Sequence, residues 1–408
     1  MKRRVVVTGL GVISSIGAGK AEFWKSLMNG KSGISDIGLF DTSDYLVHKG
    51  GEVKNFDPAV FIPKDMVKEI ARASQFAIAA TKLAFDDAGL KAEDYKNKKI
   101  AIILGTTMGE AGMIEEADKH WSAQGEEDVW ALTVSKYPGN AISDNIARFF
   151  GLKSLSLVIP TACSGGNYAI GHGYDLVRKG AVDCAIVGGS DTFSRIAFTG
   201  FSRLFAMAQD MCRPFDKNRK GMMLGEGAGI LILEESVSAV KRSAGAYAEV
   251  SGYGLSCDAS HMTAPLSGGI VKVMEKAIKN SCIDKKDVGY ISAHGTGTPA
   301  NDKMEYNAIN SVFGGLAKKI CVSSIKSMLG HTMGAASALE AISCCLAVNE
   351  QMVPPTINFE TPDEECPVDC VPNKARRVEI DAVLNNSLAF GGNNACVVFK
   401  KTDHRRSQ

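Results

Sequence analysis

The fold is decided by the stretch Leu155-Ser-Leu-Val-Ile-Pro-Thr-Ala-Cys163-Ser-Gly-Gly-Asn-Tyr168, which joins a predicted strand to a predicted helix. Leu155 to Ile159 has the composition of a buried strand, and Pro160 ends it. Ser164 to Gly166 keep the backbone open before a helical pattern runs to Lys179. The cysteine therefore stands at the tip of a strand-to-helix turn.

A cysteine at a helix N-terminus has a specific chemistry. Unpaired backbone N–H groups and the positive end of the helix dipole favour the thiolate, which is the reactive form. We therefore expect Cys163 to be a nucleophile. The alternative is a buried structural cysteine, the commonest role of a free cysteine in a protein core.

Composition bounds the class of protein. The chain has 408 residues, 45% of them hydrophobic, which is enough for two or more domain-sized units. Its 46 basic and 45 acidic residues nearly cancel, so no global field favours nucleic acid or an anionic membrane. The N-terminus has no signal-peptide pattern, and no apolar segment is long enough to span a bilayer. We expect a soluble cytoplasmic protein.

The eleven cysteines do not form a disulfide pattern, because their number is odd and their spacing irregular. Several lie in apolar runs and are predicted to be small core residues: Cys184, Cys344, Cys345 and Cys396. Cys366 and Cys370 have a metal-like spacing, but no second pair or nearby histidine completes a site. We expect a reducing compartment and no bound metal.

Strands alternate with helices along the chain, which predicts an α/β fold with parallel layers. The segment from Asn140 to Gly151 resembles that from Asn307 to Gly314, and each leads through a strand into a turn and a small-residue helix. Cys163 and His331 therefore take equivalent places in two halves, residues 1–245 and 246–408. If the halves pack pseudo-symmetrically, both helix N-termini face one cavity.

Several local expectations follow from the pattern. Met66 to Leu90 is predicted to be one long helix, and residues 111–131, charged and irregular, a surface excursion. Gly188 to Asp191 is predicted to be a Gly-rich turn. Gly9-Leu-Gly11 resembles a dinucleotide fingerprint but lacks its third glycine and the later acidic residue, so a plain strand-to-loop turn is expected.

Two histidines stand in Gly-flanked turns that follow predicted strands, His294 and His331. Beside a cysteine in the same setting they are candidates for a base or for donors to an oxyanion. Lys326 and Glu305 lie close to them in sequence, and a buried lysine and glutamate are expected to pair, since unpaired charges are costly inside a protein.

Together these motifs resemble the condensing-enzyme family, specifically β-ketoacyl-[acyl carrier protein] synthases of the type II elongating kind. The resemblance covers the full length and depends on motifs in a fixed order: Thr161-Ala-Cys163, Arg213-Pro-Phe-Asp216, Gly225-Glu-Gly-Ala-Gly229, His294-Gly-Thr-Gly-Thr298-Pro with Asp302 and Glu305, Lys326-Ser-Met-Leu-Gly-His331, and Phe390-Gly-Gly-Asn. It implies the thiolase fold, two similar halves in a five-layered αβαβα arrangement, and usually a homodimer.

The resemblance also implies roles for the candidate residues. Cys163 would take an acyl chain from acyl carrier protein as a thioester, and His294 and His331 would assist decarboxylation of the malonyl carrier and stabilise the enolate. The N–H groups of Cys163 and Phe390 would form the oxyanion hole, with electrostatic support from Lys326 and Glu305. Residues expected to contact the substrate are Thr296 and Thr298 on the phosphopantetheine arm, and Met108, Phe201, Gly391 and Gly392 around the acyl chain.

Partner and cofactor expectations follow from the same likeness. Lys64, Lys68 and Arg72 share one face of the predicted helix, which favours docking of the acidic acyl carrier protein. Because decarboxylation drives the reaction, no metal or redox cofactor is expected.

One stretch departs from the family pattern. Where elongating synthases read Gly-Phe-Gly-Phe-Gly-Gly-Thr-Asn, this chain reads Ser387-Leu-Ala-Phe-Gly-Gly-Asn-Asn394. Loss of glycine at Ala389 removes backbone freedom, and loss of an aromatic at Leu388 changes the lining of the loop. We hypothesise an atypical acyl substrate from a specialised fatty-acid or polyketide pathway.

Other readings remain open at this point. A thiolase needs a second cysteine in a C-terminal Gly-rich turn, whereas Cys396 lies in an apolar strand pattern. Priming synthases carry asparagine in place of the second histidine, and non-catalytic chain-length partners lack the cysteine. A ketosynthase that works with such a partner in a heterodimer is also consistent. An oxidoreductase would depend on Gly9-Leu-Gly11 alone.

Overall fold

The computed structural model describes residues 3–95, 98–124, 133 and 136–403. Its first half contributes a run of five neighbouring strands in the order β6-β5-β7-β8-β1. Their bounds are β1 (Val5–Ser14), β5 (Ile100–Gly105), β6 (Ser154–Ile159), β7 (Cys184–Asp191) and β8 (Gly227–Glu235). β6, β5 and β7 are parallel, whereas β8 and β1 are antiparallel to their neighbours.

The second half repeats this arrangement in the order β11-β10-β14-β15-β9. Its strands are β9 (Ala248–Cys257), β10 (Val288–Ser292), β11 (Cys321–Ser323), β14 (Ala382–Leu388) and β15 (Asn393–Lys400). Counted along the chain, both runs have the order third, second, fourth, fifth, first, and the same strands are parallel in each. The duplication that the sequence predicts is therefore present in the strand topology.

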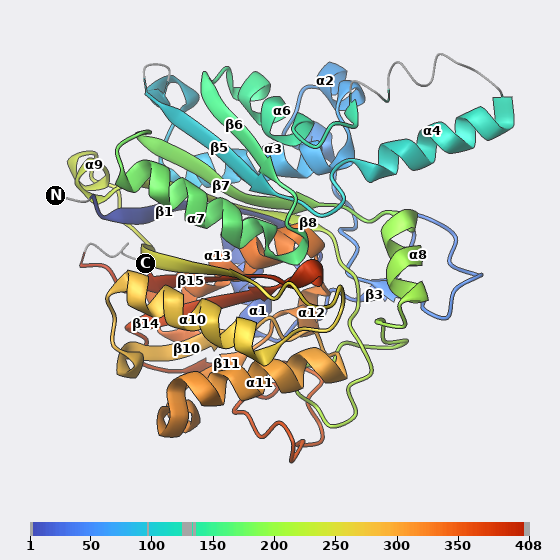
Figure 1. Ribbon diagram of the computed structural model, residues 1–408. Coiled ribbons are helices and arrows are strands. Elements are labelled where there is room, and N and C mark those ends of the chain that lie inside the picture. The colour runs from blue at the N-terminus through green and yellow to red at the C-terminus, as the bar shows by residue number, and fades with distance from the viewer. Residues whose placement is uncertain (1–2, 96–97, 125–132, 134–135, 404–408) are drawn as a thin grey trace.

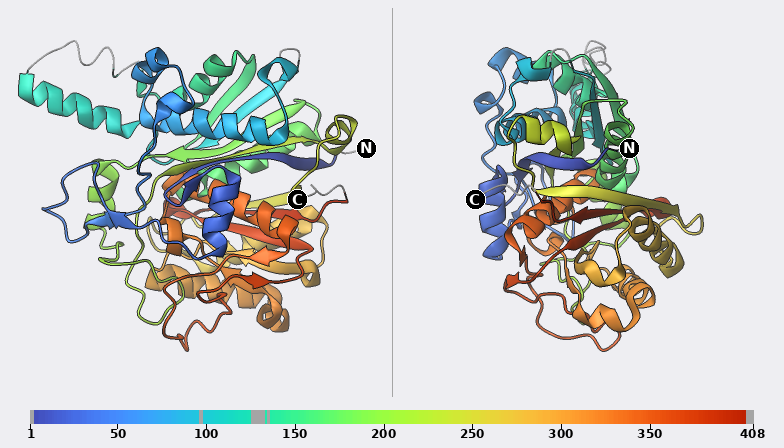
Figure 2. Two further views of the ribbon diagram at one scale, coloured as in Figure 1. Left: turned by 180° about the vertical axis from the view of Figure 1, so that it is seen from behind. Right: turned by 90° about the vertical axis from the view of Figure 1, so that its left-hand side faces the viewer.

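Helices complete five layers (Figure 1). α3 (Arg72–Ala88) and α6 (Ala141–Phe150) cover the outer face of the first sheet, and α10 (Ser267–Ser281) and α11 (Pro299–Phe313) cover that of the second. Between the sheets lie α7 (Gly165–Arg178) and α13 (Ala336–Glu350), which contact both of them. The views of Figure 2 show the same layering from behind and from the side. This αβαβα arrangement is the thiolase fold that was expected.

The central position of α13 explains its composition. Every residue from Ala336 to Val348 is buried, so the helix is apolar on all sides rather than along one stripe. The first strands of the two runs, counted along the chain, also meet, because β1 pairs with β9 through Val5–Val7 and Ala248–Val250. The two sheets thereby form one continuous hydrogen-bonded path. The division at residues 245 and 246 stays a prediction; it falls between α9 (Ser236–Lys241) and β9.

Shorter elements connect these layers. The remaining helices are α1 (Lys20–Met28), α2 (Lys64–Glu69), α4 (Ala111–Gln124), α8 (Arg195–Arg203) and α12 (Lys326–Leu329). The two-residue strands are β2 (Gly17–Ala18), β3 (Ser35–Asp36), β4 (Lys49–Gly50), β12 (Met352–Val353) and β13 (Arg376–Arg377). Short 3-10 turns occur at η1 (Pro58–Val60), η2 (Ala92–Tyr95), η3 (Ala162–Ser164), η4 (Lys285–Asp287), η5 (Gly314–Lys319), η6 (Met333–Ala335) and η7 (Phe390–Gly392).

Gly9 and Gly11 are not in a turn, contrary to expectation. Both lie within β1, whose ten residues are all buried. A Cβ on Gly11 would overlap the carbonyl oxygen of Ala80, and one on Gly9 that of Ala84, both in α3. The glycines therefore let a helix backbone lie directly against the strand, which is a packing role and not a nucleotide-binding one.

Two other local predictions, the long helix and the Gly-rich turn, are wrong for identifiable reasons, whereas the predicted surface excursion is present in its described part as a helix. The expected long helix is interrupted at Ile70, whose backbone is extended, and α3 begins anew where the carboxylate of Glu110 accepts the N–H groups of Ala73 and Ser74. Residues 111–124 form the helix α4, which projects from the body in Figure 1, while residues 125–132 lie outside the described part. Gly188 to Asp191 continue strand β7 through pairing with β8.

The cysteines behave as small apolar residues. All eleven are free thiols, and nine of them are buried, including Cys184, Cys344, Cys345 and Cys396 as predicted. Cys366 and Cys370 pack in the core of the second half, and no cluster of metal-ligating side chains occurs among the described residues. None of the helices in the described part of the chain combines the length and hydropathy that a membrane crossing requires.

Replacement of Gly11 by alanine tests the contact between β1 and α3. We expect Gly11→Ala to lower the free energy of unfolding by ~1–3 kcal/mol, because the added methyl group overpacks a buried backbone contact. Denaturant unfolding measures the change. Gly112→Ala is the matched control, since a Cβ there meets nothing within 4 Å and alanine favours the helix. Equal stability of both variants and the parent would contradict the assignment.

Candidate active site

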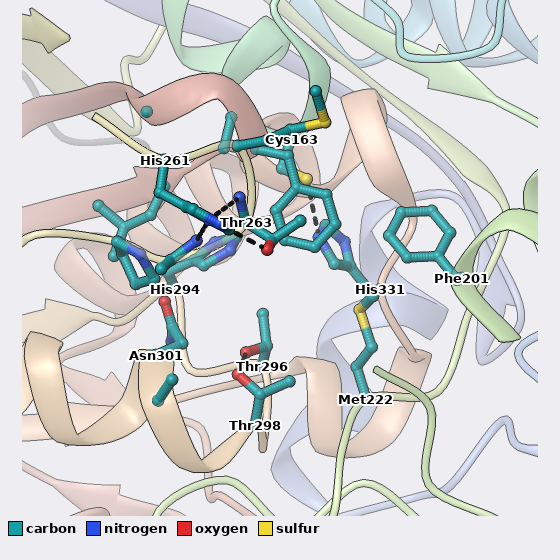
Figure 3. Close-up of a pocket in the computed structure, with 18 residues that line it drawn as sticks. Cys163, Phe201, Met222, His261, Thr263, His294, Thr296, Thr298, Asn301 and His331 are labelled. Carbon is teal, nitrogen blue, oxygen red and sulfur yellow. Dashed lines mark hydrogen bonds between the residues drawn. The ribbon is translucent and has the colours of Figure 1, made fainter. Parts of the chain in front are cut away.

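Three reactive side chains from distant parts of the chain line one pocket (Figure 3). Cys163 lies in η3, ahead of α7; His294 follows β10; His331 lies between α12 and η6. Their exposed fractions are 6%, 4% and 2%. Because parallel strands end at the same edge of a sheet, the two halves deliver these buried residues to a shared cavity.

The two halves correspond closely at this point. η3 and η6 each follow a threonine, Thr161 and Thr332, and each begins with a residue of positive φ, 48° at Ala162 and 51° at Met333. When the two turns are aligned in this way, Gly334 corresponds to Cys163 of the first half. His331 lies three residues before Gly334. The two turns are therefore equivalent, but the predicted equivalence of Cys163 and His331 is wrong, because the histidine precedes its turn and the cysteine lies inside its own.

His331 contacts the nucleophile directly. Its Nε2 lies 3.1 Å from Cys163 Sγ, and its Nδ1 accepts the N–H of Met333 at 3.2 Å. A neutral imidazole that accepts at Nδ1 carries its proton on Nε2, so the N–H is directed at the sulfur. Burial, and next the positive charge of Lys326, hold the pKa of His331 well below its usual range. The side chain is therefore a neutral donor.

His294 is held in the same state by a different partner. The ammonium group of Lys326 lies 3.4 Å from His294 Nδ1 and donates to the carbonyl oxygen of His294 at 2.7 Å. Burial first, then Lys326 and His331, lower the pKa of His294 well below its usual range. The two imidazole rings meet edge to face, 5.5 Å apart. Both rings thus present an Nε2–H group to one pocket.

Lys326 does not pair with Glu305, contrary to expectation. Its ammonium group forms a buried ion pair with Glu340 of α13. Glu305, on α11, accepts the backbone N–H groups of His294 and Gly295, each at 2.9 Å, and so fixes the loop after β10. Burial raises the pKa of Glu340 to about 7, against the opposing effect of Lys326. Glu340 was not predicted from the sequence. It is the only charged residue between Ala336 and Val348, and a single charge in an otherwise apolar helix was a usable signal.

The state of Cys163 also differs from the expectation of a thiolate. Burial raises the pKa of the thiol to about 12, and outweighs the lowering effects of Lys326 and of a backbone N–H. The negative charges of Asp191 and Glu340 act in the same direction as burial. The free enzyme therefore holds a neutral thiol at physiological pH, and the helix N-terminus alone does not ionise it.

The loop that covers the pocket carries the sequence departure. The ring of Phe390 lies 5.8 Å from that of Phe201 across the pocket, and Leu388 and Ala389 are buried in its lining. Ala389 has φ −118° and ψ 151°, which an L-residue adopts without strain. Gly391 and Gly392 have φ 83° and 79°, the left-handed region that favours glycine. In this conformation the loop tolerates alanine at 389.

The structure brings most of the predicted substrate residues together. Thr296, Thr298, Phe201, Phe390 and Gly392 line the pocket, and the hydroxyl groups of the two threonines are 2.9 Å apart. Gly391 does not line it; its N–H donates to the carbonyl oxygen of Met262 at 2.7 Å. Met108 packs beside the pocket, in an apolar cluster that it shares with Phe201 and Met222. Lining residues without a sequence signal are Met222, His261, Met262, Ala264, Pro265 and Asn301.

The proposed basic stripe is only partly present. Lys64 and Lys68 are exposed on α2, but Arg72 opens the separate helix α3. Its guanidinium group pairs with the fully buried carboxylate of Glu226 at 2.7 Å and donates to the carbonyl oxygen of Val53. The interruption at Ile70 turns Arg72 away from the two lysines. Arg72 is therefore a structural cation, and the sequence prediction of a three-residue stripe is wrong.

Comparison with known proteins agrees with this geometry. The family descriptions "Beta-ketoacyl synthase, N-terminal domain" and "Beta-ketoacyl synthase, C-terminal domain" match residues 2–239 and 247–360. The chain belongs to the β-ketoacyl synthase family. Similar sequences include 3-oxoacyl-[acyl-carrier-protein] synthase 2 of Synechocystis sp., 39% identical over 98% of both chains, and that of Coxiella burnetii, 37% identical over 98% of this chain and 99% of the relative.

Solved structures give the same result. The ishigamide ketosynthase/chain length factor has a TM-score of 0.95 and 43% identity, covering 98% of this chain and 100% of the other. A type II polyketide ketosynthase in complex with its acyl-carrier protein has a TM-score of 0.90 and 31% identity over the same shares. The protein is thus an acyl-transferring condensing enzyme of the 3-oxoacyl-[acyl carrier protein] synthase type, and the oxidoreductase reading is excluded.

The ionisation state of Cys163 gives a testable pH dependence. Because the pKa of the thiol is raised to about 12, alkylation by iodoacetamide should accelerate ~10-fold per pH unit between about pH 7 and pH 9, without a plateau. Peptide-level mass spectrometry separates Cys163 from the exposed thiols of Cys257 and Cys282, which serve as internal controls. A plateau below about pH 8 would show a thiolate instead.

Proposed function

We propose that the protein joins an acyl group held on Cys163 to a malonyl unit carried by acyl carrier protein, giving 3-oxoacyl carrier protein, CO2 and free carrier. The observation that carries this proposal is the contact of 3.1 Å between Cys163 and His331 in a pocket that His294 shares. A nucleophile beside two neutral donors suits acyl transfer followed by formation of an enolate.

The first half-reaction moves the acyl group onto the enzyme. Cys163 Sγ attacks the thioester carbonyl carbon, the new C–S bond forms, and the carrier's thiol leaves with the proton that Cys163 gives up. The oxyanion formed on the way lies within reach of the N–H groups of Cys163 and Phe390. The neutral thiol loses its proton only as the bond forms, so the reaction needs no net ionisation of the resting enzyme.

The second half-reaction uses the histidines. The malonyl carboxylate leaves as CO2, and the electron pair of the broken C–C bond passes into the thioester as an enolate. The Nε2–H groups of His294 and His331 donate to its oxygen, an arrangement that stabilises the charge that develops on the enolate. The enolate carbon then attacks the acyl carbonyl, and Cys163 is released and takes up a proton. Lys326, Glu340 and Glu305 hold the two rings in place.

Binding of the carrier's arm is assigned to the threonines. Thr296 and Thr298 present their hydroxyl groups to the pocket on the side of α11. A phosphopantetheine arm carries amide and hydroxyl groups that can accept and donate there. We further propose acyl carrier protein as the partner, a dimer as the working form, and catalysis without metal or redox cofactor. The ketosynthase complex with its acyl-carrier protein supports the first of these.

The pathway is proposed to be a specialised one. Identity to the ishigamide ketosynthase/chain length factor, 43%, exceeds the 39% found for a synthase 2 relative. Leu388 and Ala389 line the pocket where the family pattern has an aromatic residue and a glycine. We therefore propose acyl chains other than ordinary saturated ones, with a related non-catalytic chain as the alternative to a second copy in the dimer. A thiolase is not favoured, because Cys396 is fully buried within β15 and cannot serve as a second active cysteine.

A condensation assay tests the function. Purified protein is incubated with malonyl carrier protein and a panel of acyl carrier proteins that differ in length and saturation. We expect 3-oxoacyl product from the parent and none from Cys163→Ala, because the variant cannot form the acyl thioester. His294→Ala and His331→Ala should still acylate Cys163 but decarboxylate malonyl carrier protein at least ~10²-fold more slowly. Intact-protein mass spectrometry and CO2 release measure the two steps.

The same assay has clear contrary outcomes. Product formation by Cys163→Ala would refute the nucleophile. Equal loss of acylation and decarboxylation in the histidine variants would refute the division of labour. A preference for saturated C10 to C16 chains would refute the specialised substrate while leaving the reaction class intact.

The exposed lysines of α2 test the docking surface. Lys64→Glu with Lys68→Glu should raise KM for acyl carrier protein by roughly 5–20-fold and leave kcat unchanged, because reversed charges oppose an acidic partner. The effect should shrink as salt is added. Lys318→Glu with Lys319→Glu is the matched control, on the exposed surface of η5 in the opposite outer layer. Similar changes in both double variants would contradict a local docking site.

A further inference from the structure

Asp191 is a buried carboxylate to which the reaction steps above give no role. It is the last residue of β7 and is fully buried, and no cation pairs with it in the described part of the chain. Burial raises its pKa to about 6, and the hydrogen bonds that it accepts oppose the shift, so the group is charged at neutral pH. A charge buried without a counter-ion needs hydrogen-bond donors, and Asp191 has four.

Both carboxylate oxygens are fully engaged. Oδ1 accepts from the hydroxyl of Thr106 at 2.8 Å and from the N–H of Met108 at 2.9 Å. Oδ2 accepts from the N–H of Thr107 at 2.7 Å and from the N–H of Gly334 at 2.6 Å. Three donors belong to the turn that follows β5, and the fourth belongs to η6 of the other half. Asp191 therefore ties two segments together that are 227 residues apart.

Close backbone packing makes this tie rigid. A Cβ on Gly334 would lie 2.6 Å from Asp191 Oδ2 and 2.5 Å from the Cα of Thr106. A Cβ on Gly189, two residues before Asp191, would lie 2.6 Å from the carbonyl oxygen of Gly334. The turn after β5 and the turn η6 therefore cannot shift independently of the end of β7.

The two segments bear on different parts of the pocket. The N–H of Met333, the first residue of η6, donates to Nδ1 of His331 and so sets the proton on Nε2. Met108, in the turn after β5, packs in the apolar cluster that includes Phe201 and Met222, two residues of the pocket lining. Met333 belongs to the same cluster. An acyl chain that enters this apolar cluster would contact the turn after β5. Through its hydrogen bonds to that turn and to η6, Asp191 links the position of the turn to that of His331.

We propose that Asp191 is a positioning residue for condensation, which couples the apolar end of the acyl pocket at Met108 to the alignment and tautomer of His331. The coupling rests on the proposed function, since it assumes an acyl chain on Cys163. It acts through the backbone N–H groups of Met108, Gly334 and, one residue away, Met333. Asp191 itself touches no reacting atom.

Asp191→Asn removes this coupling at constant size. Each carboxylate oxygen accepts a backbone N–H, so either orientation of the amide directs an NH2 group at a donor. One of the two segments must then move. We expect condensation turnover to fall at least ~10-fold and most for the longest acyl chains, while acylation of Cys163 stays within ~3-fold of the parent. Asp183→Asn, the same change at an exposed residue just before β7, is the matched control.

A spectroscopic signature separates positioning from general damage. In protein with 15N-labelled histidine, the ring nitrogens of His331, assigned from a His331→Ala difference spectrum, should show a proton on Nε2 in the parent. Asp191→Asn should mix the two tautomers, because the N–H of Met333 is displaced. Thr106→Val removes the hydroxyl that donates to Oδ1 and accepts the N–H of Gly109, and retains the three backbone hydrogen bonds to Asp191. It should therefore give a smaller loss of turnover without loss of folding.

The outcomes are distinct. Parent-like ring signals and turnover in Asp191→Asn would overturn the proposal. Equal losses of acylation and condensation in Asp191→Asn and Thr106→Val, with parent-like ring signals in the folded fraction, would also overturn it in favour of a purely structural role. If the parent itself forms no 3-oxoacyl product, the proposed function fails, whereas a tautomer change in Asp191→Asn would still show the link to His331.

Discussion

The whole site depends on direct backbone contact between the two central helices. A Cβ on Gly166 of α7 would lie 2.7 Å from the N of Ala338 in α13, and one on Gly165 would lie 2.9 Å from the Cα of Gly105 at the end of β5. The absence of a side chain at Gly166 therefore lets the backbones of the two helices approach closely. Asn167 strengthens the contact, because its N–H donates to Ser337 Oγ and its amide bonds to Asn385 of β14. This junction places the turns of Cys163 and His331 against each other.

Burial at that junction fixes the charge state of the site. In the described part of the chain, Lys326 is the buried cation that acts on both imidazoles, and the carboxylates of Glu340, Glu305 and Asp191 each accept hydrogen bonds. Desolvation lowers the pKa of both histidines and raises that of Cys163. The resting site thus holds a neutral thiol and two neutral donors, and charge develops only after a substrate has entered.

Much of this was predictable from the sequence because the relevant signals are local. A strand, a small-residue turn and a helix predict the position of Cys163, and the repeat of that pattern predicts two halves and the turn near His331. The errors arise where tertiary contacts decide. Glu340 as the partner of Lys326 depends on α13 crossing the site, and the ion pair of Arg72 depends on the buried carboxylate of Glu226, 154 residues away. Gly9 and Gly11 resemble a turn in the sequence, because nothing in the neighbouring residues shows that a helix packs directly against this strand.

The burial of the reactive side chains affects the acyl thioester on Cys163 as much as the histidines. A thiol with a raised pKa attacks slowly on its own, so burial works against acylation taken alone. The same burial excludes the water that would hydrolyse the acyl group on Cys163 while the enzyme waits for its second substrate. Exchange of one thioester for another is nearly balanced in energy and needs no ionised resting thiol, whereas loss of CO2 makes the following step irreversible. A buried site that protects the acyl intermediate is therefore consistent with a weakly nucleophilic resting cysteine. The covering loop at Leu388 to Phe390 decides which acyl groups reach this protected position.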